Sequence, residues 1–165
     1  GIRKNIRNDL PIIAPYGVNA ESSGDMYYKG SNMIHNIRQI MGNDEAFRQM
    51  LRGLNKTFYH QTVTTKEIEE YMSQAVGMNL DKIFDQYLRH TTIPTLEYRF
   101  SGQQLQYRWV TDVKDFNMPV RVKLSDNGYK LIYPGTLWHS SNITLANIKD
   151  FRVDENFYIN KKEVK

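Results

Sequence analysis

The pattern of apolar residues changes its period once along the chain, at Ile93-Pro94, and this change most constrains the fold. Before it, as in residues 47–58, apolar side chains recur every three or four positions, which is typical of amphipathic helices. After it, as in residues 96–100, apolar and polar side chains alternate, and turns rich in Gly and Asn follow one another about every ten residues. The first part is therefore expected to be helical and the second to consist of short antiparallel strands.

Together the two patterns predict an α+β protein in which a helical bundle precedes an antiparallel β-sandwich. We expect an extended leader with loops over residues 1–25, a helical region over 26–92 and the sandwich over 93–165. A strand turn is expected at residues 125–128, where Ser-Asp-Asn-Gly separates two alternating runs.

Start and stop signals divide the helical region into four helices. Glycines are expected just beyond the ends of the first and third helices, and Asn or Asp residues at the starts of the second and fourth. A Thr-x-x-Glu capping box opens the third. The residues concerned are Gly42, Asn43 or Asp44, Thr64 with Glu67, Gly77 and Asn79.

Charge and composition exclude several classes of function. The net charge of +4 comes from 22 basic and 18 acidic side chains spread along the chain, without the clustered Lys and Arg of a nucleic-acid surface. The chain has no cysteine, which excludes disulfides, thiolate nucleophiles and cysteine-ligated metals. No run approaches the roughly 18 apolar residues of a membrane span. None of this indicates a cellular compartment.

The residues alone predict no complete active site. His35, His60, His90 and His139 each lack a second histidine three or four positions away, so no local metal-ligand pair and no H-E-x-x-H motif exist. Nucleophile elbows, P-loops and dinucleotide-binding glycine motifs are absent as well. We therefore expect neither metal ligands nor cofactor-binding residues within the chain.

One segment nevertheless resembles a known family. Tyr27-Tyr28-Lys29-Gly30, followed by Gly42 and Phe47, is similar to the Y-x-K-G segment of the aminopeptidase N-like zinc metallopeptidases, or gluzincins. Further on, the run VGMNLDKIFDQYLRHTTIPTLEY resembles the passage from the family's catalytic domain into its β-sandwich, with Tyr87 where many relatives carry tryptophan. The resemblance extends from about residue 25 to the end of the chain.

The resemblance implies a specific role for one residue. In this family an H-E-x-x-H helix and a distant glutamate hold zinc, the motif glutamate acts as general base, and the first tyrosine of Y-x-K-G donates a hydrogen bond to the oxyanion. By position that residue is Tyr27, the candidate catalytic residue. Tyr28 would then be a packing partner, and Gly30 would permit close approach of helices.

The chain departs from the family because the zinc motif is missing. We therefore expect the C-terminal portion of a zinc-dependent aminopeptidase: the helical end of a thermolysin-like catalytic domain followed by the β-sandwich. Its partners would be peptide substrates and an upstream zinc-bearing domain, and this portion alone would bind no zinc and be inactive. We expect oligomers through exposed apolar faces, or an assembly in which the Met33/Ile37 or Met50/Leu54 faces meet a neighbour.

A second interpretation remains open. The chain could be a non-catalytic module of helical bundle and β-sandwich that mediates interactions or acts as a scaffold. The residues encoded immediately before Gly1 discriminate the two, because the enzyme requires an H-E-x-x-H motif and a later glutamate there.

Overall fold

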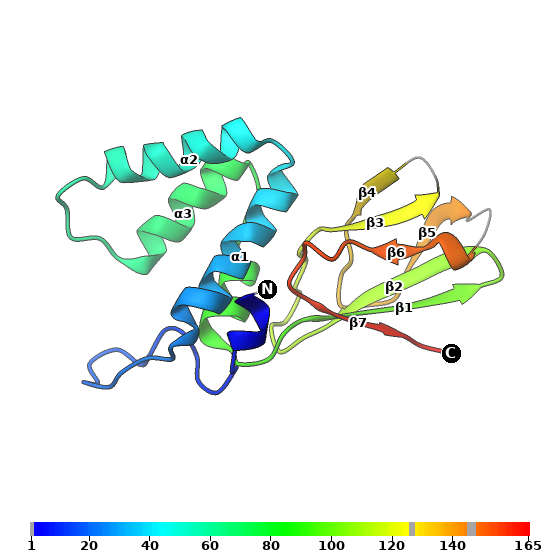
Figure 1. The fold of residues 1–165 in the computed structure, drawn as a ribbon, viewed down its shortest axis with the longest axis horizontal. Coiled ribbons are helices and arrows are strands. Elements are labelled where there is room, and N and C mark those ends of the chain that lie inside the picture. Colours follow the sequence, from blue (N-terminus) through cyan, green and yellow to red (C-terminus); the bar gives the residue numbers. More distant parts are fainter. Residues whose placement is uncertain (1, 126–127, 145–147) are drawn as a thin grey trace.

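A computed structural model describes residues 2–125, 128–144 and 148–165, with all the helical elements except the short η3 in one half and the strands in the other (Figure 1). The helical elements are η1 (Ile2–Asn5), α1 (Asp25–Met41), α2 (Asp44–Thr57), α3 (Thr65–Val76), α4 (Asp81–Phe84), the π-helical turn η2 (Asp85–Arg89) and η3 (Ile148–Asp150). The strands are β1 (Thr95–Ser101), β2 (Gln104–Val110), β3 (Val120–Ser125), β4 (Gly128–Ile132), β5 (His139–Thr144), β6 (Arg152–Val153) and β7 (Asn160–Glu163). The α+β class is thus confirmed.

Local signals determine the helix ends as expected. The Asn43 side chain accepts hydrogen bonds from two backbone N–H groups in the first turn of α2, each over 3.0 Å. Thr64 and Glu67 form the capping box of α3. Gly42 and Gly77 adopt left-handed conformations just past α1 and α3. Among the described residues, no helix is of a length and apolarity that would let it traverse a membrane.

The fourth helix differs from the expectation. It begins at Asp81, two residues later than the Asn79 start, and after one α-helical turn it widens into η2. Asn79 still stabilises the start of this helix, because its side-chain oxygen accepts a hydrogen bond from the backbone N–H of Asp81 over 2.8 Å.

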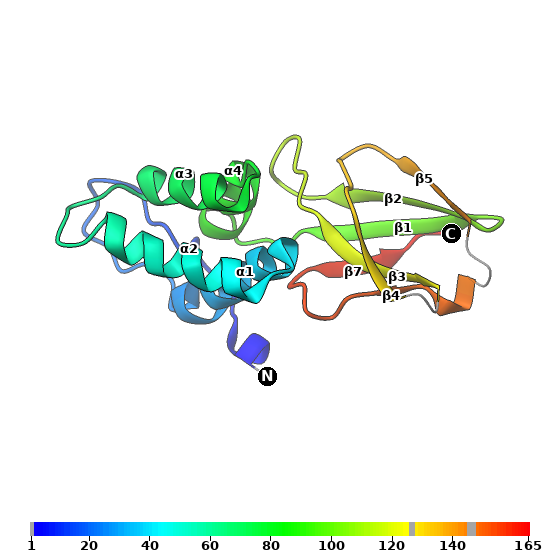
Figure 2. The ribbon, with the colours of Figure 1, turned by 90° about the horizontal axis from the view of Figure 1, so that it is seen from above.

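The strands form two mostly antiparallel sheets, with orders β5-β2-β1-β7 and β4-β3-β6. The exception is β7, which runs parallel to β1 from the pairing of Thr95 with Asn160 onward. The expected turn at 125–128 includes residues 126 and 127, which lie outside the described residues; β3 and β4 on either side of it are antiparallel. Figure 2 shows the two sheets from above, beside the helices.

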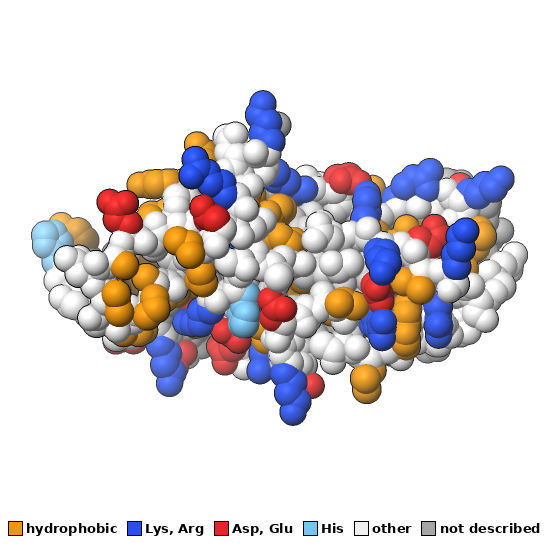
Figure 3. Space-filling view, turned by 90° about the horizontal axis from the view of Figure 1, so that it is seen from below, with side chains coloured by type: hydrophobic (Ala, Val, Ile, Leu, Met, Phe, Trp, Pro, Cys, Tyr) orange, Lys and Arg blue, Asp and Glu red, His pale blue; other side chains and the backbone are white. Residues whose placement is uncertain are grey.

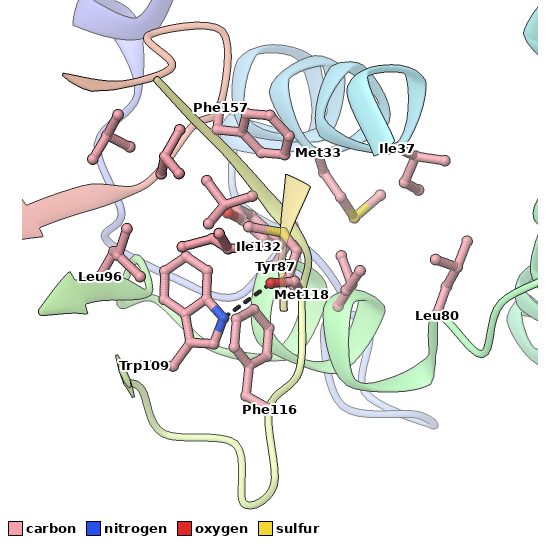
Figure 4. Packing of buried hydrophobic residues seen from close by; sticks show 14 of the residues in the cluster. Met33, Ile37, Leu80, Tyr87, Leu96, Trp109, Phe116, Met118, Ile132 and Phe157 are labelled. Carbon is pink, nitrogen blue, oxygen red and sulfur yellow. Dashed lines mark hydrogen bonds between the residues drawn. The ribbon is translucent and has the colours of Figure 1, made fainter. Parts of the chain in front are cut away.

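One hydrophobic core extends through both halves of the molecule (Figure 4). Ile37 and Leu80 enter it from the helices, and Leu96 and Trp109 enter it from the strands. The Trp109 indole N–H donates a hydrogen bond to the Met118 carbonyl over 3.0 Å, which satisfies the polar atom of this buried side chain. Because the core is continuous, the helices and sheets support each other.

The faces expected to meet a neighbour are already used within the chain. Met33, Ile37 and Met50 are all buried, so the expectation that the Met33/Ile37 and Met50/Leu54 faces await a partner is wrong. Exposed apolar side chains lie elsewhere, and those before or within the first turn of α1 are Ile2, Leu10, Tyr16, Val18, Met26, Tyr27 and Tyr28. Seen from below, several hydrophobic side chains lie together on the surface of the helical half, and Lys and Arg side chains lie around both halves (Figure 3). An oligomer through other apolar residues stays a prediction.

Candidate functional site

The candidate catalytic residue, Tyr27, projects from the first turn of α1 and is 70% exposed. Its backbone carbonyl accepts a hydrogen bond from the Ser31 hydroxyl one turn later. Tyr28 is also exposed, at 37%, and its role as the packing partner of Tyr27 stays a prediction. The first turn therefore presents two phenol rings on the surface of the molecule.

The opposite side of α1 is buried and polar. Its members recur at the helical spacing i, i+4, i+7 and i+11, and we refer to them as the polar seam: Asp25, Lys29, Asn32 and Asn36. Polar groups without partners are costly to bury, so each member requires hydrogen bonds. The structure provides them from four different parts of the chain.

Asp25 binds the N-terminal segment. Its carboxylate accepts hydrogen bonds from the backbone N–H groups of Arg7, over 2.9 Å, and Asn8, over 2.6 Å. Its own N–H donates to the Ser23 hydroxyl, which in turn donates to the Asp9 carboxylate. The leader thus folds back on the start of α1 and is held there by a buried charge.

Lys29 binds the junction between the helices and the strands. Its ammonium donates hydrogen bonds to the carbonyl oxygens of His90, over 2.7 Å, and Thr91, over 3.3 Å, just before β1 begins. Burial lowers the pKa of the Lys29 ammonium below its usual value, and the negative charge of Asp25 partly opposes this shift. The lysine of the Y-x-K-G segment is therefore an internal anchor.

The glycine of the segment does not have the role expected for it. A Cβ atom added at Gly30 would meet no atom within 4 Å apart from its immediate surroundings in the helix. The expectation that Gly30 permits close approach of helices is therefore wrong within the described residues.

Asn32 connects α1 to both ends of the chain through an arginine. Its side-chain oxygen accepts a hydrogen bond from Arg3 Nε over 2.9 Å. The same guanidinium donates to the carbonyl oxygens of Glu155, over 2.8 Å, and Asn156, over 3.0 Å. One side chain thus joins η1, α1 and the segment between β6 and β7.

Asn36 completes the seam deep in the core. Its amide donates to the Tyr87 hydroxyl over 3.0 Å, and its side-chain oxygen accepts from the backbone N–H of Tyr158 over 2.8 Å. The Tyr87 hydroxyl donates to the Tyr158 carbonyl over 2.5 Å, and burial raises the pKa of Tyr87. This network positions α1 against the strand half.

The zinc-ligand set that the resemblance implies does not fit this part of the protein. Across residues 2–125, 128–144 and 148–165, no three His, Cys, Asp or Glu side chains gather as a metal site would require. Tyr27 is the candidate site residue that this chain contributes, and it lies on a turn bracketed by Asp25 and Lys29.

Comparison with known proteins agrees with the Y-x-K-G resemblance. Residues 18–87 match the peptidase family M1 domain. Over these residues, which are fewer than half of the chain, the sequence is similar to peptidase family M1. The matched stretch, called the M1 segment below, includes Tyr27, the whole polar seam and the helices up to Tyr87. Among curated protein sequences none matches the chain.

The fold of the whole chain, beyond the M1 segment, is found in a solved structure. The crystal structure of Legionella pneumophila aminopeptidase A in complex with aspartic acid matches with a TM-score of 0.53 and 15% sequence identity. The match covers 99% of this chain and 21% of that chain, so this chain spans about a fifth of its length. At this identity the match establishes similarity of fold.

The polar seam is the feature of the candidate site that sequence reasoning missed. Its signal was present, because Asp25, Lys29, Asn32 and Asn36 follow the same helical spacing as the apolar residues beside them. Polar residues at such positions usually indicate a face exposed to solvent. Here they are buried because they form hydrogen bonds with groups that are distant in sequence.

Proposed function

We propose that this chain is the C-terminal portion of a zinc-dependent aminopeptidase, a hydrolase that removes N-terminal residues from peptides, and that Tyr27 stabilises its transition state. The observation that carries the proposal is the contrast within one helical turn: Tyr27 is exposed, while Asp25 and Lys29 beside it are buried and hydrogen-bonded. Such a turn can hold a hydroxyl donor at a fixed place on the protein surface.

The chemistry of a tyrosine suits this role. Attack of water on a peptide carbonyl converts its oxygen into an oxyanion, and a neutral O–H group can donate a hydrogen bond to the new charge. A donor positioned where charge develops stabilises the transition state more than the substrate, an effect typically worth about 10² to 10³ in rate. Among described residues no group accepts a hydrogen bond from the Tyr27 hydroxyl, which leaves it available for a ligand.

The other parts of the site are assigned to the upstream catalytic domain. A bound zinc ion would polarise the carbonyl and activate the attacking water. Its ligands, the general base and the groups that anchor the substrate amine would come from that domain, which is the proposed partner of this chain together with the peptide substrate. This chain supplies the Tyr27 hydroxyl as a hydrogen-bond donor and forms one wall of the substrate cleft beside it.

The finer architecture belongs to the same proposal. We assign residues 26–92 to the end of a thermolysin-like catalytic domain, residues 93–165 to its β-sandwich and residues 1–25 to a leader. The end of the M1 match at residue 87 and the change from helices to strands between Arg89 and Thr95 support the boundary near residue 92.

The test compares two neighbouring tyrosines in the peptidase that contains this chain. Tyr27→Phe removes one hydroxyl from an exposed ring, so folding should change little while kcat falls about a hundredfold and KM changes far less. Tyr28→Phe makes the same chemical change one residue away and should leave kcat within about threefold. Zinc content, measured by metal analysis, should be equal in both variants.

Three outcomes contradict the proposal. A near-normal kcat for Tyr27→Phe means that its hydroxyl is not the donor, and a greater sensitivity of Tyr28→Phe means that the register of the motif is wrong. If the whole protein cleaves no aminoacyl reporter substrate, the scaffold interpretation is favoured instead.

A further inference from the structure

We infer that Lys29 is a positioning residue: by binding the carbonyl oxygens of His90 and Thr91 it sets the place at which the first turn of α1 presents Tyr27. This inference rests on the proposed function of Tyr27 and adds a residue that acts through it. Three observations support it.

The first observation is the geometry of the turn. An α-helix has 3.6 residues per turn, so side chains two positions apart point in nearly opposite directions, about 200° around the axis. Lys29 follows Tyr27 by two residues, and accordingly one is fully buried while the other is 70% exposed. Any rotation or lift of the turn that releases Lys29 must therefore displace Tyr27.

The second observation concerns what holds the first turn of α1. Its N-cap residue, Gly24, has no side chain to accept a hydrogen bond from the N–H groups of that turn, and the Ser23 hydroxyl accepts the Asp25 N–H instead. Two buried charged groups four residues apart add to this local bond: Asp25 binds the leader and Lys29 binds the junction before β1.

The third observation is the nature of the anchor. The lysine reaches a backbone segment 61 and 62 residues away, at the point where η2 ends and the chain turns extended toward β1. Hydrogen bonds to a charged group are stronger than those between neutral groups. Since misplacing a catalytic group by about 1 Å can cost about a hundredfold in rate, such an anchor has a direct effect on catalysis.

The deciding experiment is a double-mutant cycle in the peptidase that contains this chain, with Lys29→Met and Tyr27→Phe. If Lys29 acts through Tyr27, Lys29→Met should lower kcat about tenfold or more in the native background and less than twofold once the Tyr27 hydroxyl is absent. KM should change less than kcat in both backgrounds. Lys56→Met, which makes the same change at an exposed position of α2, should leave kcat unchanged.

A second measurement does not depend on activity. In the 165-residue chain, Lys29→Met should speed amide hydrogen exchange at least tenfold over residues 26–30 and leave α3 unchanged. If Lys29→Met does not fold, Lys29→Gln, which keeps an N–H donor but removes the charge and shortens the side chain, takes its place in the cycle, and its loss of kcat should again be smaller once the Tyr27 hydroxyl is absent.

The outcomes separate the two proposals. An equal loss of kcat in both Tyr27 backgrounds, or unchanged exchange over residues 26–30, overturns the inference about Lys29. A Tyr27→Phe variant with normal kcat overturns the proposed function, and the exchange measurement still decides whether Lys29 holds the turn.

Discussion

Asn36 and Tyr87 form a hydrogen bond of 3.0 Å in a place where both side chains are completely buried. The Tyr87 hydroxyl also donates to the Tyr158 carbonyl. Tyr87→Phe would leave the Asn36 amide with only a weak bond to Met118 Sδ, over 3.9 Å, and would remove the hydroxyl that donates to this carbonyl. Each unsatisfied buried group is costly. We expect a loss of about 1–3 kcal/mol in the free energy of unfolding, measured by urea denaturation.

Tyr133→Phe is the matched control for this variant, because Tyr133 is 68% exposed and its hydroxyl can be hydrated. It should change the free energy of unfolding by less than about 0.5 kcal/mol. Equal effects of the two substitutions would mean that the buried network contributes nothing specific.

Gly53 in α2 lies against the ring of Tyr71 in α3. A Cβ atom at Gly53 would overlap the Tyr71 hydroxyl oxygen, and the ring is also held by an edge-to-face contact with Phe58 at 5.8 Å between centroids. Alanine improves helix propensity by up to about 1 kcal/mol, but overpacking typically costs about 1–3 kcal/mol. We expect Gly53→Ala to destabilise the chain in urea denaturation.

The control for this prediction is the same substitution in a Tyr71→Phe background. Without the hydroxyl oxygen the nearest ring carbon, at 3.4 Å, allows an ordinary contact, so Gly53→Ala should become neutral or stabilising there. If it remains as harmful as in the native chain, the overlap is not the cause.

Lys29 should make stability depend on alkaline pH. Burial lowers the pKa of its ammonium from the usual value of about 10.5. Between the lowered pKa of the folded state and about 10.5, the unfolded chain binds more protons, so the free energy of unfolding rises with pH in that window. The free energy of unfolding of the native chain, relative to that of Lys29→Met, should therefore increase from neutral pH to a pH of about 10.

Urea denaturation at several pH values measures this shift, and titration of other groups cancels in the difference. Lys56→Met serves as the reference, since an exposed lysine should give a difference that does not vary with pH. A pH-independent difference for Lys29→Met would show that its ammonium is not destabilised by burial.

Zinc should not bind tightly to the 165-residue chain by itself. A catalytic zinc site needs about three protein ligands, and the described residues gather no such group. Metal analysis after dialysis should give well below one zinc per chain, and aminoacyl reporter substrates should not be cleaved. One tightly held zinc per chain would contradict this.

The helix ends could be predicted from sequence because their causes are local. Asn43 caps α2 through N–H groups two and three residues away, and the partners in the Thr64–Glu67 capping box are three residues apart. Alternation likewise predicted β1 and β2, since the period of two in a strand requires no knowledge of its partner.

The polar seam could not be predicted because its causes are distant. Lys29 finds its partners 61 and 62 residues away, and Asn36 finds the Tyr158 N–H 122 residues away. The same holds for the parallel pairing of β7 with β1, which no local pattern encodes. The resemblance pointed to Tyr27, whereas the side chains that fix its turn became visible only in the folded chain.

The bridge made by Arg3 has a consequence for how the chain reaches its final form. Its guanidinium joins Asn32 to the carbonyl oxygens of Glu155 and Asn156, which lie 152 and 153 residues further along. On a ribosome Arg3 emerges before its partners and must wait, with its charge solvated, until residues 155 and 156 have been synthesised. Contacts of such long range form slowly because they require closure of a large loop. Arg3, although made early, therefore completes its contacts only after the segment between β6 and β7 has been made.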